Sequence, residues 1–111
     1  MRLVIEYIGK GPRDLDMISV AHYGEQNGDP MRDPEIMFEV CPDGEGSLAF
    51  HPVAIQQDYI GSYREAVWHD EMGRVMIHPA RVRDIAAFAR IWDRNLKHQG
   101  FVDAAVVQAA R

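Results

Sequence analysis

Acidic and amide side chains are concentrated between residues 22 and 40, where two Asp-Pro bonds, at 29–30 and 33–34, interrupt the chain. Carboxylate and amide groups can ligate a hard cation, exchange protons with a substrate, or contact a partner protein. Their order does not follow the Asp-x-Asp-x-Asp-Gly spacing of a calcium-binding loop. We therefore interpret the stretch as a shaped loop between two strands. Its candidate contact residues are Glu25, Gln26, Asn27, Asp29, Arg32 and Asp33.

A second polar block lies between residues 56 and 65 and combines two amides, two tyrosines and a pair of opposite charges around Gly61. Tyrosine and arginine are favoured anchors of protein interfaces, which makes the block a candidate contact patch. The alternative is a strand entry with a bulge at Gly61. The residues that we add to the candidate interaction surface are Asp58, Tyr59, Tyr63 and Arg64.

The five histidines are spread over separate segments, and no pair has the spacing of a zinc-binding HExxH helix. We therefore expect no metal ion, no cofactor and no catalytic residue. A site assembled from distant residues remains the alternative. A small metal-dependent or hydrolytic enzyme would build it from His22, Glu25, Asp29, His51 and Asp58.

The single cysteine, Cys41, allows no intramolecular disulfide and suits a reducing compartment. A catalytic thiol needs a histidine partner and an electropositive setting. Its sequence neighbours are instead the acids Glu39 and Asp43, which disfavour a thiolate. We therefore interpret Cys41 as structural.

A stripe of basic residues is predicted on the C-terminal helix, opposite its apolar side, by the rotation of 100° per residue. Such a stripe could contact phosphates or an acidic protein, although a solvated outer face has the same composition. Aromatic side chains that would stack on bases are not interleaved with it. The stripe consists of Arg83, Arg90, Arg94 and Lys97.

Strands dominate the first two thirds of the chain. Residues 2–8 and 16–23 are rich in apolar side chains. Residues 35–41 alternate, with Ile36, Phe38 and Val40 on one face and Glu35, Met37, Glu39 and Cys41 on the other. Residues 47–57 form a weaker strand that Pro52 interrupts, and residues 62–69 and 74–78 flank a turn that contains Gly73. Short connections favour antiparallel pairing.

Helical periodicity begins at Pro79, which suits the first turn of a helix, and ends before Gly100. Apolar residues recur every three or four positions between residues 80 and 99, as on the buried side of an amphipathic helix. The tail at 101–110 is either a short second helix that docks through Phe101, Val102, Val106 and Val107, or a frayed end. The fold class is α+β, with an antiparallel sheet of five to six strands and one long helix on one face.

The length of 111 residues fits a single domain over 1–111. The net charge of −5 is uneven: residues 25–73 carry eleven acids and two arginines, whereas residues 74–111 carry seven bases and three acids. We expect a cytoplasmic protein, since no stretch reaches the roughly 18 apolar residues of a membrane span and the first residues form a strand rather than a signal peptide. We expect a monomer or a homodimer, because such a sheet leaves edges to protect.

Three blocks of the sequence resemble a family. Residues 22–40, 57–65 and 88–100 are similar to motifs of a small bacterial domain of unknown function, DUF6908, in the same order. The sequence departs from that pattern in having Gly24 where an aromatic residue is common, Pro30 for a leucine-like residue and Ile36 for methionine. The resemblance implies genes carried on plasmids, integrative elements and phages. It implies no activity, substrate or catalytic residue.

Taken together, these patterns predict a non-enzymatic binding or regulatory module that acts through contact with a protein partner. The acidic middle of the chain is electrostatically suited to a basic partner. A nucleic-acid partner is not expected, and weak contact with nucleic acid through the basic helix stripe is a further alternative.

Overall fold

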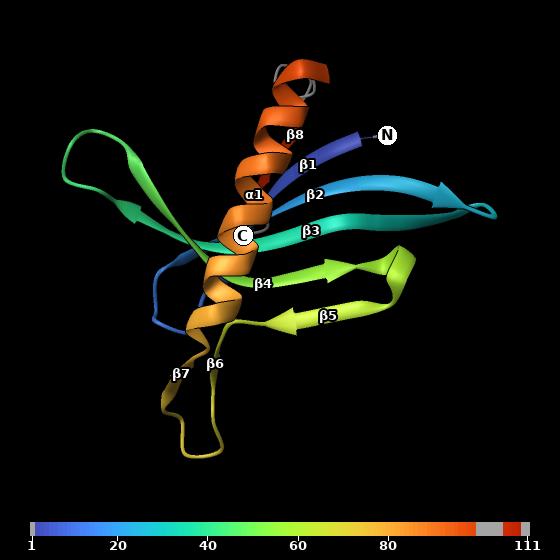
Figure 1. Cartoon of the computed structure of the whole chain (residues 1–111). Helices are drawn as coiled ribbons and strands as arrows, with labels where there is room; N and C mark the ends of the chain where they lie inside the picture. The colour runs from blue at the N-terminus through green and yellow to red at the C-terminus, as the bar shows by residue number, and fades with distance from the viewer. Residues whose placement is uncertain (1, 100–105, 110–111) are drawn as a thin grey trace.

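A twisted β-sheet crossed by one long helix forms the molecule (Figure 1). The computed structural model describes residues 2–99 and 106–109, and side chains from residue 3 to residue 92. The strand order is β5-β4-β3-β2-β1-β8, and every neighbouring pair except β1·β8 is antiparallel. The central strands are β1 (Arg2–Lys10), β2 (Asp16–Gln26), β3 (Asp29–Pro42) and β4 (Leu48–Gln57).

A short 3-10 helix, η1 (Asp58–Ile60), turns the chain from β4 into the edge strand β5 (Ser62–Glu65). Gly61 ends this turn with a φ of 61°, a left-handed conformation that glycine adopts without steric cost. The sequence alternative of a bulge at Gly61 is therefore replaced by a helix cap at the same residue.

A two-stranded ribbon, β6 (Val67–His69) and β7 (Val75–Ile77), extends below the main sheet in Figure 1. All three residues of β7 are exposed. The Asp70 carboxylate accepts backbone N–H groups of Met72 and Arg74 in the turn, at 2.9 Å each. At the end of β6 next to this turn, His69 Nε2 donates to the carbonyl of Pro12 at 2.6 Å.

The long helix α1 (Pro79–Gln99) packs on one face of the sheet, mainly against β4. His78 caps its first turn, because its Nδ1 accepts the backbone N–H of Arg81 at 3.2 Å. Ile85 is buried on the side of the helix that faces the sheet. The shared core consists of Ile36, Phe38, Val53, Ala54, Ile55, Ala66, Val67 and Ile85, with Val82, Ala89 and Trp92 packed against it.

The predicted α+β class, the antiparallel sheet and the helix on one face are confirmed. The alternation predicted for residues 35–41 is seen at Ile36 and Phe38, which are buried in the core. Val40 is half-buried, and Glu39 on the other face is completely buried. Pro52 does lie within a strand. The register shifts there, with Met37 opposite Ala54 and Phe38 opposite Pro52, so β4 accommodates the proline at a bulge.

Two expectations are wrong. Residues 24–34 form strand on both sides of a tight turn rather than a loop, because only Asn27 and Gly28 are needed to reverse the chain. The helix proposed for the tail fails where the tail is described: residues 106–109 form β8 (Val106–Ala109), parallel to β1. The long helix supplies the crossover that parallel pairing requires, and the β-branched valines suit a strand. Phe101 and Val102 lie outside the described residues.

The connection between β1 and β2 folds over the helix-free face and buries Glu39 completely. The Glu39 carboxylate accepts Arg13 Nε at 2.7 Å, the Arg13 backbone N–H at 2.9 Å and the Leu15 N–H at 3.4 Å. Gly11 passes so close that a Cβ there would lie 2.4 Å from Glu39 Cγ. The Glu39 carboxylate therefore has a structural role, because it binds the β1–β2 connection to the sheet.

No helix in the described parts of the chain combines the length and the apolar character needed to cross a bilayer.

Candidate functional site

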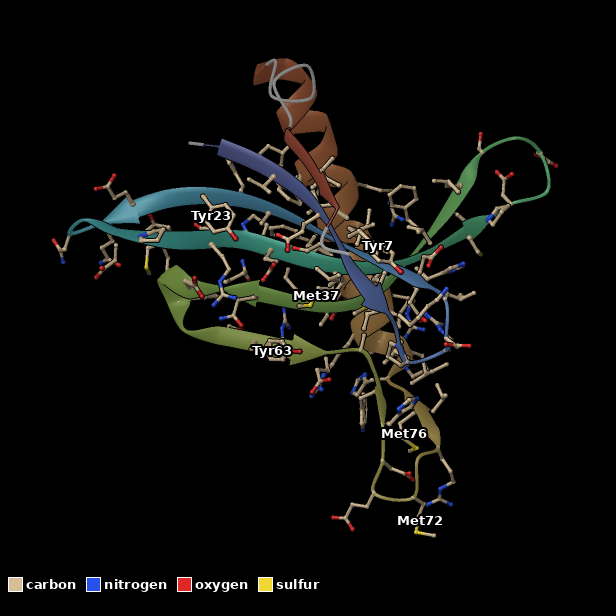
Figure 2. The ribbon with its side chains drawn as sticks, turned by 180° about the vertical axis from the view of Figure 1, so that it is seen from behind. Tyr7, Tyr23, Met37, Tyr63, Met72 and Met76 are labelled. Atoms are coloured by element: carbon tan, nitrogen blue, oxygen red, sulfur yellow. The ribbon has the colours of Figure 1, made fainter. Side chains whose placement is uncertain are left out.

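The face of the sheet opposite α1 is the one that the helix leaves uncovered, and Figure 2 looks onto it. Because side chains alternate along strands and paired residues share a face, the register Ser19–Met37–Ala54 places these three residues on this face. The neighbouring row holds Glu35, Gln56 and Tyr63. Polar groups of the two candidate blocks therefore meet on one surface.

The hairpin of β2 and β3 projects at one end of this surface (Figure 1). Asn27 and Gly28 form its turn, with φ angles of 52° and 84°. Positive φ at both central residues is the geometry of a tight two-residue hairpin turn, and Asn-Gly is its preferred sequence. Residues 25–30 are all exposed, so Glu25, Gln26 and Asp29 stand at the tip.

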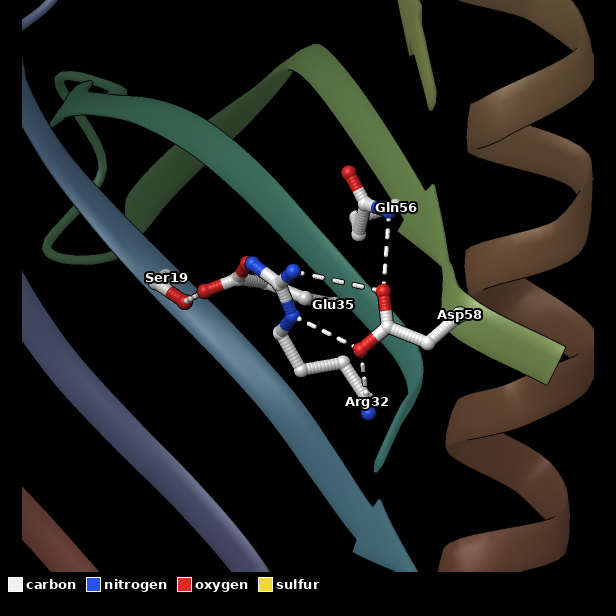
Figure 3. A network of polar contacts seen from close by, with 5 residues as sticks. All are labelled: Ser19, Arg32, Glu35, Gln56 and Asp58. Carbon is white, nitrogen blue, oxygen red and sulfur yellow. Dashed lines mark hydrogen bonds and ion pairs between the residues drawn. The ribbon is translucent and has the colours of Figure 1, made fainter. Parts of the chain in front are cut away.

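An ion pair between Arg32 and Asp58 joins this hairpin to η1 (Figure 3). Arg32 Nε and Nη2 donate to the two oxygens of Asp58 at 3.0 and 3.2 Å, which is a bidentate arrangement. The backbone N–H of Arg32 adds a third bond to Asp58 Oδ2 at 2.8 Å. Two residues that the sequence suggested as separate contacts are therefore partners of one another.

Three further side chains extend the network. Gln56 Nε2 donates to Asp58 Oδ1 at 2.9 Å, Arg32 Nη1 lies 3.2 Å from Glu35 Oε1, and Ser19 Oγ donates to Glu35 Oε2 at 2.5 Å (Figure 3). The hydrogen bond from Arg32 is the largest cause that lowers the pKa of Asp58, and its counterpart raises the pKa of Arg32. Both groups therefore stay charged around neutral pH.

A second link holds the hairpin, since Tyr59 Oη donates to the carbonyl of Glu25 at 3.3 Å. Tyr63 follows on β5 with half of its surface exposed. Burial, then Glu65 and Glu35, raise the pKa of Tyr63, so its hydroxyl remains protonated. Arg64 points to the other face of the same strand, where its backbone partner is Ile55.

We call the surface formed by Glu25, Asp29, Arg32, Asp33, Glu35 and Asp58 the acidic hairpin end. It contains five carboxylates and one guanidinium, a net charge of −4. The positive charge of Arg32 is paired with Asp58 and Glu35, so it does not offset the carboxylates at the exposed tip. The exposed carboxylates at the tip retain a negative field that favours positively charged groups.

The residues of the enzymatic alternative lie at separate places. His22 is buried in β2, where desolvation lowers its pKa, whereas Glu25 and Asp29 stand at the tip and Asp58 is bonded to Arg32. His51 lies on β4, next to Glu39 on β3. Among the described residues, no three His, Cys, Asp or Glu side chains form a group that could hold a metal ion.

Cys41 does have a histidine partner, which its sequence neighbours do not indicate. Its Sγ lies 3.6 Å from His51 Nε2 across the β3–β4 pair. Only the strand register places these two residues, ten positions apart, side by side. The contact is half-buried and joins the two strands near their hairpin.

The predicted basic helix stripe is described in part. Arg83 and Arg90 are exposed on α1. The side chains of Arg94 and Lys97 lie outside the described residues.

The sequence did not suggest Ser19 as part of the site. Gln56 lay in the second polar block and Glu35 in the stretch from 22 to 40, and neither was selected as a candidate contact residue. The available signal was the alternation along each strand, which places all three on the face opposite the core. Their bonds to Arg32 and Asp58 depend on the register, which the alternation alone does not fix.

Comparison with family models matches residues 1–102 to a domain of unknown function, DUF6908. No curated protein and no solved structure matches the chain.

Proposed function

Since the chain belongs to the DUF6908 family, whose description gives no activity, we propose that it is a non-enzymatic binding module that contacts a basic surface of a partner protein. The proposed contact surface is the acidic hairpin end. The observation that supports this function most directly is the net charge of −4 of this surface, on a hairpin whose tip residues 25–30 are all exposed.

The negative charge of the acidic hairpin end supports the proposal in two ways: it speeds association with a basic partner, and it selects against acidic ones. Exposed carboxylates at Glu25 and Asp29 attract a basic partner before contact and repel an acidic one. Other exposed acids exist, for example Glu45 and Glu71, but these belong to the β3–β4 and β6–β7 turns. Because these turns are separate from the β2–β3 tip, variants of Glu45 and Glu71 can serve as controls for variants of the tip.

Preorganisation supports it as well. The Asn27-Gly28 turn fixes the tip, and the Arg32–Asp58 ion pair and the Tyr59–Glu25 bond hold its two strands against η1. A surface that is ordered before binding loses less conformational entropy when a partner docks. The network thus positions the exposed acids while keeping its own arginine occupied.

The resemblance to one family, whose genes we expect on plasmids, integrative elements and phages, suggests that this module belongs to a mobile genetic element. In that setting the partner would be a host protein with a basic nucleic-acid-binding surface, for which the acidic hairpin end competes. This part of the proposal rests on analogy of charge and size. Genes adjacent to homologues would test it, since recurring neighbours from defence systems are expected and random neighbours would contradict it.

The binding surface is tested by reversing charge at the tip. Glu25→Lys together with Asp29→Lys should weaken binding of a labelled arginine-rich peptide by about tenfold or more at low salt, because two attractive contacts become repulsive. The matched control is Glu45→Lys together with Glu71→Lys, which changes the net charge equally on two other exposed turns. Fluorescence anisotropy at two salt concentrations measures both.

The same pair of variants identifies the natural partner. A protein recovered from host lysate by the unaltered chain and by the control, but not by the tip variant, is the expected result. Equal losses in both variants would show that only net charge matters, and the acidic hairpin end would then have no special role.

A further inference from the structure

A pocket lies at the opposite end of the edge strand from the hairpin, where β5, the base of β6 and the first turn of α1 meet. Its volume is about 260 Å³, and its lining residues are Tyr63, Arg64, Glu65, Trp68 and Arg81. Sites for drug-sized molecules are typically about 300–1,000 Å³. The pocket is therefore suited to one amino-acid side chain rather than to a cofactor.

The pocket concentrates positive charge in an acidic protein. Arg64 and Arg81 line it, and Glu65 is the single carboxylate. Arg81 Nη1 donates to the backbone carbonyl of Glu65 at 3.2 Å, a neutral acceptor. Within residues 3–92, neither guanidinium forms an ion pair with a carboxylate. An anionic group that enters the pocket would give the guanidinium groups of Arg64 and Arg81 an ion-pair partner.

Backbone hydrogen-bonding groups beside the pocket face away from β4, toward the open edge of the sheet. β5 is the terminal strand of the sheet and pairs only with β4 on its inner side among the described strands. The Glu65 carbonyl bonds to Arg81 and not to β4, so Glu65 presents its backbone outward. Two residues earlier, Tyr63 presents its N–H and C=O to the same open edge, because inward and outward groups alternate in an antiparallel strand.

We propose that β5 accepts an extended peptide of a partner protein as an additional strand, with a carboxylate side chain of that peptide in the pocket between Arg64 and Arg81. Main-chain bonds to an open sheet edge supply affinity in this mode of recognition, and a pocket for one side chain supplies specificity. Arginine is suited to bind a carboxylate with two parallel bonds. Trp68 provides an apolar wall for the methylene groups of the bound side chain.

The partner chemistry is opposite to that of the acidic hairpin end, and the inference does not depend on the function proposed for that surface. One surface selects basic groups at the β2–β3 tip, whereas the other selects an acidic extended segment at the β5 edge. A protein that carries both would bridge two partners or two regions of one partner.

Three blocked peptides of alternating threonine and valine test the proposal with the unaltered, isotope-labelled chain. The first has a central glutamate, the second has glutamine in its place, and the third keeps the glutamate but has N-methylated backbone nitrogens on the pairing edge. We expect the first peptide to shift the amide resonances of Tyr63 and Glu65 and the indole resonance of Trp68. We expect the second to bind about tenfold more weakly and the third not to bind.

Variants of the chain locate the charge contact. Arg81→Gln and Arg64→Gln should each weaken binding of the glutamate peptide, whereas Arg83→Gln, on an exposed position of the same helix, should leave it unchanged. Urea unfolding of each variant establishes that the fold is retained. Within residues 3–92 the Arg64 side chain forms no ion pair, so its variant keeps the test valid if Arg81→Gln unfolds.

Four results would overturn the proposal. The first is that the glutamate peptide causes no shifts at the β5 edge. The second and third are that the glutamine peptide or the N-methylated peptide binds as tightly as the glutamate peptide. The fourth is that inorganic phosphate displaces the glutamate peptide as well as a second copy of that peptide does. The last two would identify a simple anion site without strand addition.

Discussion

Replacing Glu39 by glutamine should destabilise the protein more than any other single neutralisation of a described acid. The carboxylate is fully buried and accepts three N–H donors, from the Arg13 side chain and from the backbones of Arg13 and Leu15. A glutamine has one oxygen and one NH₂ group. In either orientation its NH₂ group faces at least one of these donors.

The magnitude follows from what is lost. A hydrogen bond to a charged group contributes about 1.5–3 kcal/mol, and breaking a buried ion pair by removing one partner costs about 3–5 kcal/mol. Arg13 keeps 30% of its side-chain surface exposed, so water compensates part of its loss. We therefore expect Glu39→Gln to lower the free energy of unfolding by about 3 kcal/mol.

Urea unfolding monitored by circular dichroism measures this change, with Glu45→Gln in the exposed β3–β4 turn as the control. The control should alter stability by less than about 0.5 kcal/mol. Arg13→Met combined with Glu39→Gln should cost less than the sum of the two single changes, by about 1–3 kcal/mol. A loss from Glu39→Gln no larger than that of Glu45→Gln would refute the reasoning.

Three further predictions concern other buried or bonded groups. Desolvation in the folded state lowers the pKa of His22 below its ordinary value of 6.5, so the unfolded chain binds more protons. The free energy of unfolding should therefore fall as pH drops below about 6.5. In urea midpoints measured against pH, a His22→Gln variant should lose this step. Arg32→Gln removes the bidentate contact to Asp58 and should cost about 1 kcal/mol, a value discounted because Arg32 is 41% exposed; amide exchange in the β2–β3 hairpin should accelerate, and unchanged exchange would contradict the link. His78→Ala removes the cap of α1 and should cost about 1 kcal/mol in thermal unfolding, whereas His78→Asn, which can still accept the Arg81 N–H, should retain most of it.

Local patterns account for the parts of the fold that were predicted correctly. The alternation around Ile36 and Phe38 records which side of a strand is buried, and the interval from Pro79 to Gly100 marks a helix by its own start and stop residues. In both cases the signal lies within the segment itself, so no knowledge of its partners is needed.

Pairing between distant segments accounts for what was missed. Residues 24–34 have the composition of a loop, yet β2 and β3 pair with each other up to Gln26 and Asp29, and Arg32 is bonded to Asp58 of η1, so the chain remains extended through most of them. Arg32 and Asp58 were both identified as candidate contacts, although their mutual bond, 26 residues apart, depends on a register that the bulge near Pro52 displaces. The Cys41–His51 contact depends on the same register.

The β6–β7 ribbon has a consequence for how the native state opens. A two-stranded ribbon is marginally stable by itself. This one is held at its base by the bond from His78 N–H to the Ala66 carbonyl, and at the turn end of β6 by the His69–Pro12 bond. Its backbone should therefore exchange hydrogen by local unfolding well before the central strands do. Each such opening leaves the main sheet intact and frees the exposed β7 segment, with its run of Val75, Met76 and Ile77.

Among the described segments, we therefore expect the ribbon to be an early site of cleavage by a protease. Arg74, which flanks the apolar run and is bonded to Asp70, opposes association of freed segments by its charge. Cleavage there would begin while the core that carries both proposed binding surfaces is still folded.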